Sequence, residues 1–269
     1  ENPKLTTSMV PPCTSASTTP TSSSSRMRIG ERKRRGAPVH ERSIEECTKT
    51  ERDVVEDEET KPMDAYEEEL LRSLRQRYQG RDGKISDDYA LMLIRGWRGD
   101  KDAEKITMKQ YGRLLDLRKE HGIDDILKSH VEGYQEFNRN LECGVLGTTR
   151  TGTLVYYERT GLSDPRKMKK MGFDRAQRCH LRLQEEIRVR KAVQSRKLGR
   201  RMYKHVVVLD LKGFGFRHLS PEVVRKMRAV MALDGEIWPG ALKKVIVVNT
   251  PWVFQKAWSI AKVTLHPAT

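Results

Sequence analysis

The residues best placed for chemistry follow an apolar run at positions 206–209. This run leads directly into Asp210 and then into Lys212-Gly213-Phe214-Gly215-Phe216. A glycine pair after a strand could cradle a phosphate, but His218 stands where the G-x-G-x-x-G fingerprint requires its third glycine. The segment therefore indicates an apolar turn. Asp210 ends a predicted strand, where catalytic carboxylates often lie, yet hydrogen bonding to the following turn is its simpler role.

Other catalytic and metal-binding patterns are missing from the sequence. Neither the G-x-x-x-x-G-K-[ST] phosphate loop nor the G-x-S-x-G elbow occurs. No metal-binding spacing relates His180, His205 and His218. No C-x-x-C pair exists, which argues against a zinc site or a disulfide framework and fits a reducing compartment; the cysteines are Cys13, Cys47, Cys143 and Cys179. We expect no catalytic residue, no metal and no cofactor, and a protein that is not an enzyme.

The positive charge is concentrated in one block. The 269 residues carry a formal net charge of +15, and residues 166–204 hold 15 Lys and Arg against three Asp and Glu, a net charge of +12. Such a block favours a polyanion or an anionic membrane surface, or it forms a solvated helix face. Nucleic acid is not the expected partner, because only Phe173 and Tyr203 interrupt the block and base stacking requires interleaved aromatic residues.

The first 128 residues divide into a tail and a helical segment. Residues 1–60 include a long stretch of Ser, Thr and Pro that cannot bury enough apolar surface to offset its ordering entropy, so we predict a disordered tail. Residues 63–128 show helical periodicity, with Asp64 as an N-cap and Gly122 as a helix stop. We predict a small all-α domain in this segment.

Residues 131–269 change to alternating strands and helices. Strands are predicted at 144–148, 154–160, 206–209 and 245–248, and helix starts at Asp174, Ser220-Pro221 and Thr250-Pro251. Apolar runs joined by helices are typical of a parallel sheet. The predicted fold class is therefore α/β: a mostly parallel sheet with flanking helices, preceded by the small all-α domain and the tail.

Several pieces, in the same order, resemble the CRAL-TRIO lipid-binding domain family, which includes phosphatidylinositol and phosphatidylcholine transfer proteins. In the α/β segment they are Gly152–Glu158, Val206–Gly213, Trp238-Pro239, Asn249–Trp258 and Leu265–Thr269. Upstream, Leu93–Arg98 with Asp102, and Leu117–Asp124, resemble the family's amino-terminal helical domain. The resemblance covers roughly residues 66–269 and assigns residues 131–269 to the lipid-binding domain.

The resemblance implies an apolar lipid cavity over a five-stranded sheet. The residues that would face it are Tyr156, His205, Val207, Val245, Val247 and Phe254. The cations that would contact the membrane or a headgroup are Arg166, Lys167, Lys169 and Lys170. The family closes its cavity with a helical gate beyond the P-x-T motif, and the chain stops at Thr269, so we expect a fragment that is incomplete at its C-terminus.

The same resemblance leaves the ligand open. His205 and Val207 replace the small hydroxyl residues of phosphatidylcholine transfer members, and Gly240 replaces an acidic residue used for phosphatidylinositol. A phospholipid, a phosphoinositide or an isoprenoid such as a sterol remains compatible. We expect a monomeric, cytoplasmic, peripheral membrane protein that binds a lipid and transfers it between membranes. The alternatives are a membrane-docking regulatory or scaffold module without transfer activity and, with less support, a nucleic-acid-binding protein.

Overall fold

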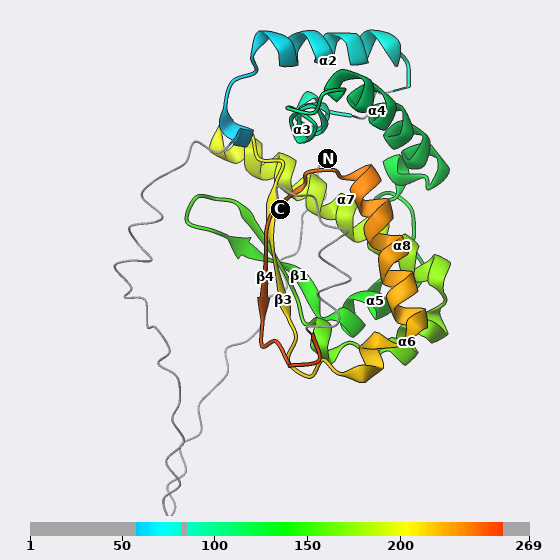
Figure 1. The fold of residues 1–269 in the computed structure, drawn as a ribbon. Helices are drawn as coiled ribbons and strands as arrows, with labels where there is room; N and C mark the ends of the chain where they lie inside the picture. The colour runs from blue at the N-terminus through cyan, green and yellow to red at the C-terminus, as the bar shows by residue number, and fades with distance from the viewer. Residues whose placement is uncertain (1–57, 82–84, 255–269) are drawn as a thin grey trace, which may run out of the picture. The chain divides into compact units, whose positions relative to one another are not determined.

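The structure, a computed structural model, describes residues 58–81 and 85–254, and these all belong to one compact unit spanning residues 54–269 (Figure 1). Its α-helices are α2 (Ala65–Arg77), α3 (Asp87–Gly96), α4 (Ala103–Glu120), α5 (Tyr134–Leu141), α6 (Pro165–Met171), α7 (Phe173–Leu198) and α8 (Pro221–Ile237). Its strands are β1 (Cys143–Thr148), β2 (Leu154–Glu158), β3 (His205–Asp210) and β4 (Leu242–Val248). Short 3-10 helices are η1 (Glu58–Thr60), η2 (Ile123–Asp125), η3 (Thr160–Leu162) and η4 (Phe216–Leu219).

The helix-start signals of the sequence operate at α2 and α8. The Asp64 carboxylate accepts a hydrogen bond from the backbone N of Glu67 at 3.0 Å, and the Glu67 carboxylate accepts one from the backbone N of Asp64 at 3.4 Å. This reciprocal capping box satisfies two amides that the helix leaves unpaired. Ser220 caps α8 with Pro221 in the first turn, as predicted. Gly122 follows α4 in the left-handed conformation, with φ at 55°.

The start of the long basic helix differs from the prediction. Helix α7 begins at Phe173, and Asp174 lies in its first turn instead of capping it. Gly172 separates α6 from α7 with φ at 87°, a backbone conformation that glycine adopts without the steric cost of a β-carbon. The basic block is therefore divided between two helices, because Gly172 lets the chain turn between α6 and α7.

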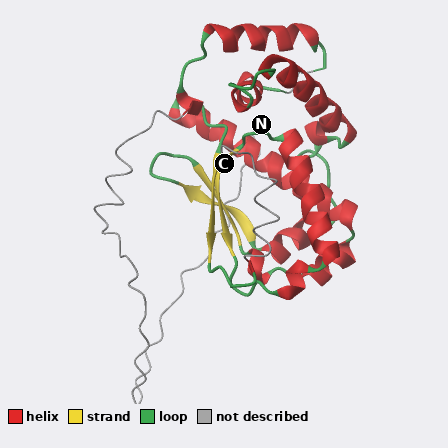
Figure 2. Cartoon of the chain, viewed as in Figure 1, coloured by secondary structure: helices red, strands yellow, loops and turns green. Residues whose placement is uncertain are grey.

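The four described strands form one mixed sheet in the order β1-β2-β3-β4 (Figure 2). Strands β1 and β2 pair antiparallel, whereas β2, β3 and β4 run parallel. Helix α7 connects β2 to β3, and α8 connects β3 to β4. Successive right-handed crossovers in one direction place both helices on the same side of a sheet, as Figure 1 shows for α7 and α8. The predicted α/β class with a mostly parallel sheet is confirmed.

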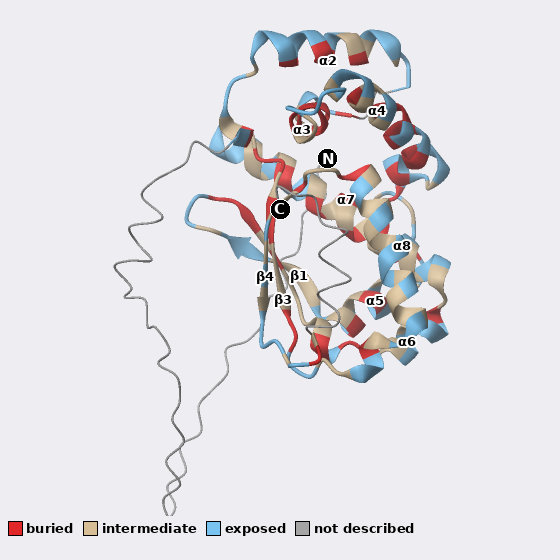
Figure 3. Cartoon of the chain, viewed as in Figure 1, coloured by how far each residue is buried: buried red, intermediate tan, exposed pale blue. Residues whose placement is uncertain are grey.

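Buried side chains of the helical segment and of the α/β segment form one hydrophobic cluster. Members include Leu74 of α2, Tyr111 of α4, Tyr156 of β2, Leu181 of α7 and Trp238 after α8, none more than 6% exposed. Figure 3 shows buried positions concentrated along α3 and on the sides of α2 and α4. The segment predicted as a separate all-α domain therefore packs its apolar faces against the helices that cover the sheet.

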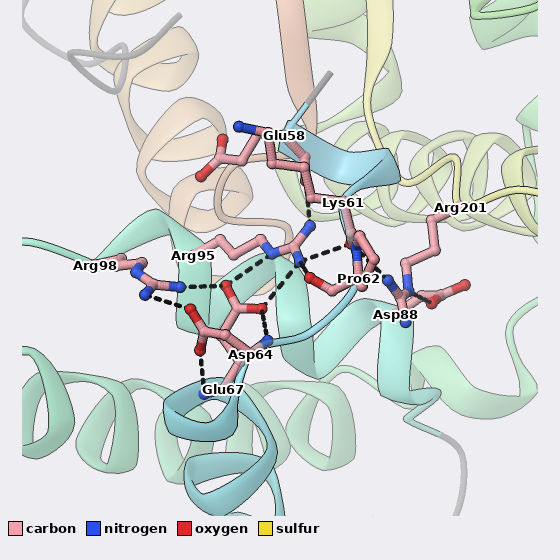
Figure 4. A network of polar contacts seen from close by, with 9 residues as sticks. All are labelled: Glu58, Lys61, Pro62, Asp64, Glu67, Asp88, Arg95, Arg98 and Arg201. Carbon is pink, nitrogen blue, oxygen red and sulfur yellow. Dashed lines mark hydrogen bonds and ion pairs between the residues drawn. The ribbon is translucent and has the colours of Figure 1, made fainter. Parts of the chain in front are cut away.

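Buried charges hold the first described residues onto this cluster (Figure 4). Arg95 of α3 donates to both carboxylate oxygens of Glu67, at 3.0 and 2.9 Å. The same guanidinium donates to the backbone carbonyls of Glu58, of Lys61 at 3.0 Å and of Pro62 at 3.2 Å. A guanidinium carries five N–H donors in a planar fork, so one side chain can bind several acceptors at once.

A second buried carboxylate joins the same segment to the sheet. Glu59 is only 2% exposed, and it accepts hydrogen bonds from the backbone N of Tyr203 at 3.0 Å and of Lys204 at 2.8 Å, immediately before β3. Residues 58–60, the end of the segment predicted as a tail, are therefore part of the folded unit. Residues 1–57 lie outside the described residues, as does the helix predicted after Thr250-Pro251 beyond residue 254.

Candidate functional site

Five of the six residues expected to line a lipid cavity lie on one face of the sheet. Tyr156 pairs with Val207 and Val207 with Val245, so these three lie side by side across β2, β3 and β4. His205 and Val247 are two residues away along their own strands, and alternate residues of a strand share a face. Phe254 instead lies beyond β4, as a helical residue directly after the turn at Trp252 and Val253.

Helices cover this face unevenly. Tyr156 and His205, at 6% and 3% exposed, are buried towards the amino end of β3. Val207, Val245 and Val247 are only partly buried. The described residues therefore cover the carboxyl half of this face less completely than its amino end. We call Val207, Val245 and Val247 the valine row.

Neutral hydrogen-bonding groups lie beside the valine row. The Tyr156 hydroxyl donates to Oε2 of Glu158 at 2.9 Å, and the Thr160 hydroxyl donates to Oε1 of the same carboxylate at 2.9 Å. Burial raises the pKa of the Tyr156 phenol well above its ordinary value, so the phenol stays protonated. Burial also raises the pKa of the Cys143 thiol to about 11, which makes it a poor nucleophile at neutral pH.

His205 is a buried neutral imidazole. Burial, and secondly the charge of Lys191 on α7, lower its pKa to about 3. Its Nδ1 atom has no hydrogen-bond partner among the described residues. Lys191 is itself 5% exposed, donates to the Tyr203 carbonyl at 2.6 Å, and has its pKa lowered to about 7 by burial. An unpaired buried ring nitrogen is costly, so His205 is a group that a polar ligand atom could satisfy.

Asp210 has the structural role that the sequence favoured. Its carboxylate accepts hydrogen bonds from the backbone N of Lys212 at 2.9 Å, from the Tyr157 hydroxyl at 2.8 Å and from the Asn249 amide at 2.8 Å. These bonds lower the pKa of Asp210 to about 2, with Asn249 the largest cause. The carboxylate therefore joins the ends of β2, β3 and β4. The turn role of Asp210 was predicted from the sequence, whereas its contacts with Tyr157 and Asn249 were not, because only the strand register brings these two residues to Asp210.

The opposite face of the sheet is also apolar. Val155, Val206, Val208, Ile246 and Val248 alternate with the residues of the first face. Ile246 and Val248 are 38% and 36% exposed. None of the residues predicted to contact lipid lies on this second face, although the uninterrupted apolar runs of β3 and β4 indicate that both faces of these strands are destined for burial.

The four cations predicted to meet a membrane lie together on α6, and all four are exposed. Lys169 pairs with Glu222 of α8 at 3.0 Å, and Arg166 lies 3.5 Å from Asp164. Lys167 and Lys170 form no ion pair with any described residue.

Much of the remaining basic block is committed within the fold. Arg188 pairs with Glu185 at 2.8 Å and Arg182 with Glu186 at 3.1 Å. Arg178 donates to the His121 carbonyl at 2.7 Å. The high charge of residues 166–204 therefore does not translate into one continuous free surface, and exposed cations remain on α6 and in the second half of α7.

Neither a metal centre nor a membrane span emerges from residues 58–81 and 85–254. No three His, Cys, Asp or Glu side chains in these ranges gather closely enough to hold a metal ion. Within the same ranges, no helix has the length and apolar character needed to cross a bilayer.

The architecture is a mostly parallel sheet preceded by a helical bundle, and known proteins share it. The crystal structure of Sfh5 superimposes with a TM-score of 0.58 at 16% sequence identity, over 78% of this chain and 79% of that one, and so has the same fold. Residues 138–269 match the CRAL/TRIO domain. This part of the chain belongs to the CRAL/TRIO domain family.

Two curated relatives have informative names. Phosphatidylinositol/phosphatidylcholine transfer protein SFH9 of Arabidopsis thaliana is 30% identical over 189 residues, which are 68% of this chain and 32% of that protein. The Sec14 cytosolic factor of Schizosaccharomyces pombe is 26% identical over 180 residues, 66% of this chain and 63% of that protein. The chain spans only about a third of the length of its Arabidopsis relatives, 32% to 39% in four of them.

Proposed function

We propose that this chain binds a lipid over the valine row and transfers or presents it between membranes. The observation that carries the proposal is the alignment of Val207, Val245 and Val247 on a half-covered face of a CRAL/TRIO sheet. Each CH₂ group of an acyl or isoprenoid chain that leaves water for such a surface contributes about 0.8 kcal/mol. A long apolar chain would therefore be held without any covalent chemistry, consistent with a protein that is not an enzyme.

The polar end of the lipid would meet the buried end of the same face. Tyr156 and His205 lie beside the valine row, and His205 Nδ1 lacks a partner among the described residues. Because the imidazole is neutral, Nδ1 would serve as a hydrogen-bond partner for a hydroxyl or an ester group and not as a cation for phosphate. Phe254 would lie at the entrance, beyond β4. Phospholipids and isoprenoid alcohols both carry groups of this kind.

The proposed setting is the cytoplasm, where a monomer docks reversibly on an anionic membrane through Arg166, Lys167, Lys169 and Lys170. The second candidate, a docking module that moves no lipid, is favoured by Lys167 and Lys170, which are exposed and form no ion pair within the described structure.

A vesicle assay separates the two candidates. The full chain is mixed with donor vesicles that carry fluorescent phosphatidylcholine, phosphatidylinositol or sterol, and with unlabelled acceptor vesicles containing phosphatidylserine. We expect dequenching of at least one label at a rate that increases with protein concentration. Sedimentation of the protein with vesicles without movement of any label would instead support the docking module.

A further inference from the structure

Three large apolar side chains lie exposed at the carboxyl edge of the sheet. Leu162 in η3, Phe216 in η4 and Trp252 after β4 are 41%, 66% and 71% exposed. The rings of Phe216 and Trp252 meet edge to face, with centroids 5.7 Å apart and planes at 73°. We call these three residues the aromatic edge. Two aromatic rings that share a contact, yet both remain in water, form a patch and not a pair of isolated surface residues.

Backbone contacts fix the aromatic edge to the sheet. Arg217 donates to the Gly161 carbonyl at 3.1 Å, and Nε2 of His218 lies 3.0 Å from the Ser163 carbonyl, so η4 is tied to η3. Gly161 packs so tightly that a β-carbon there would lie 2.5 Å from the carbonyl carbon of Leu211. The two loops therefore present Leu162 and Phe216 from a rigid base, which lowers the conformational entropy lost on binding.

The α6 cations border the same edge. Helix α6 begins at Pro165, two residues after the Ser163 contact, and Lys169 reaches Glu222 in the first turn of α8. Lys212, in the turn after β3, and Arg217, in η4, add two exposed cations. The acidic groups beside them are Asp164 and Glu222, both already in contact with α6 cations. The border of the aromatic edge is therefore net positive.

We propose that the aromatic edge inserts into the headgroup region of an anionic bilayer while the cations of α6 contact the lipid phosphates. Trp and other aromatic rings favour the interface between hydrocarbon and water, and basic residues near it gain from the negative surface potential. The inference rests on the proposed function, because this edge is the end of the sheet at which the half-covered valine row opens. The occupant is a phosphatidylserine-containing membrane; a soluble protein partner would not require both features.

Tryptophan fluorescence and vesicle binding test the insertion directly. The probe is a vesicle of phosphatidylcholine with about a third phosphatidylserine, a fraction chosen to produce a strongly negative surface. We expect the tryptophan fluorescence of the full chain to shift to the blue and to be quenched by brominated acyl chains. Trp252→Phe should lose most of that quenching. Its vesicle affinity should stay within about threefold of the parent's, since Phe preserves an apolar ring. Phe216→Ser with Trp252→Ser should weaken vesicle binding at least tenfold.

Two controls make the result specific. Leu146→Ser changes a side chain that is also 71% exposed, but on β1, and should leave binding unchanged. Lys167→Ala with Lys170→Ala should reduce the preference for phosphatidylserine, since each basic residue near the surface contributes a part of the attraction, and leave the Trp252 contact with neutral vesicles. Circular dichroism confirms that each variant is folded.

The inference is overturned if the double serine variant binds anionic vesicles as the parent does, or if quenching does not depend on Trp252. The latter result would mean that another part of this chain or a protein partner covers the edge. Lipid that co-purifies with the chain is measured in parallel. A chain that holds lipid but does not insert Trp252 refutes only the insertion, whereas a chain that inserts but never holds lipid refutes only the proposed function.

Discussion

Arg95 and Glu67 form a buried, bidentate ion pair, with side chains only 3% and 4% exposed and N–O distances of 3.0 and 2.9 Å. This pair joins α2 to α3, and through the additional bonds of Arg95 it also holds the segment before α2. Glu67 also pairs with the half-exposed Arg98 at 2.8 Å, whereas Arg95 has no other carboxylate partner among the described residues. Loss of Glu67 would therefore leave the Arg95 charge uncompensated inside the protein.

Replacement of Glu67 by Gln should lower the free energy of unfolding by about 3–5 kcal/mol, the usual cost of breaking a buried pair on one side. The matched control is Glu69→Gln, which breaks an exposed pair with Arg72, side chains 65% and 69% exposed, and should cost less than about 1 kcal/mol. Urea denaturation of both variants measures the difference. Equal losses would show that the Arg95 network does not contribute as its burial implies.

The histidine at the start of β3 should make stability depend on pH. The pKa of His205 falls from 6.5 to about 3 on folding, first through burial and then through Lys191. Between these values the unfolded chain binds a proton that the folded chain excludes, so the free energy of unfolding falls as the pH falls through this window. At pH 5 the loss at this site is about 2 kcal/mol. His205→Phe should remove that part of the difference between pH 7 and pH 5 in urea denaturation; an unchanged difference would contradict the assignment.

A glycine at the carboxyl edge should tolerate no side chain. In Gly161→Ala the new β-carbon would collide with the backbone of Leu211 and Lys212, which cannot move without distorting β3. The free energy of unfolding should fall by roughly 1–3 kcal/mol, as in overpacked cores. Gly144→Ala, in β1 with nothing within 4 Å of its β-carbon, should change it by less than about 0.5 kcal/mol. If thermal melts show the same shift for both variants, the close approach at Gly161 is not a constraint.

Neighbouring residues on opposite faces of β3 can locate the lipid. Val207→Asn places a polar amide on the valine row, whereas Val208→Asn places the same group on the other face. We expect Val207→Asn to weaken lipid binding by about tenfold, because an amide buried without a partner costs on the order of 1–3 kcal/mol. The lipid affinity of Val208→Asn should stay within about threefold of the parent's, a difference of roughly 0.6 kcal/mol in binding free energy. Titration with a fluorescent lipid analogue compares them, and a reversed order would move the lipid to the face of Val206 and Val248.

Local signals in the sequence predicted local structure well. The caps at Asp64 and Ser220 and the turn role of Asp210 depend on residues close in the chain, and the structure shows each of them. The predicted start of α7, with Asp174 as its N-cap, was wrong. Gly172 occupies the N-cap position with a positive φ, and this outweighed the capping preference of Asp174.

Contacts over long separations could not be read from the sequence. The bonds from Arg95 to Glu67, and from Glu59 to the amides of Tyr203 and Lys204, join residues that are 28, 144 and 145 positions apart. The sequence showed that these residues are charged, but a charged residue in a polar segment is normally solvated. For the same reason the block of cations at 166–204 gave no sign of how many were already paired within the fold.

Native mass spectrometry can show directly whether the chain carries a lipid. The full chain is incubated with vesicles of mixed phospholipids and sterol, separated from them by gel filtration, and transferred intact into the spectrometer. We expect a second species heavier by the mass of one lipid, at a fraction that falls about tenfold in Val207→Asn and stays near the parent level in Val208→Asn. A folded chain that carries no lipid from any of these vesicles would contradict the proposed lipid binding.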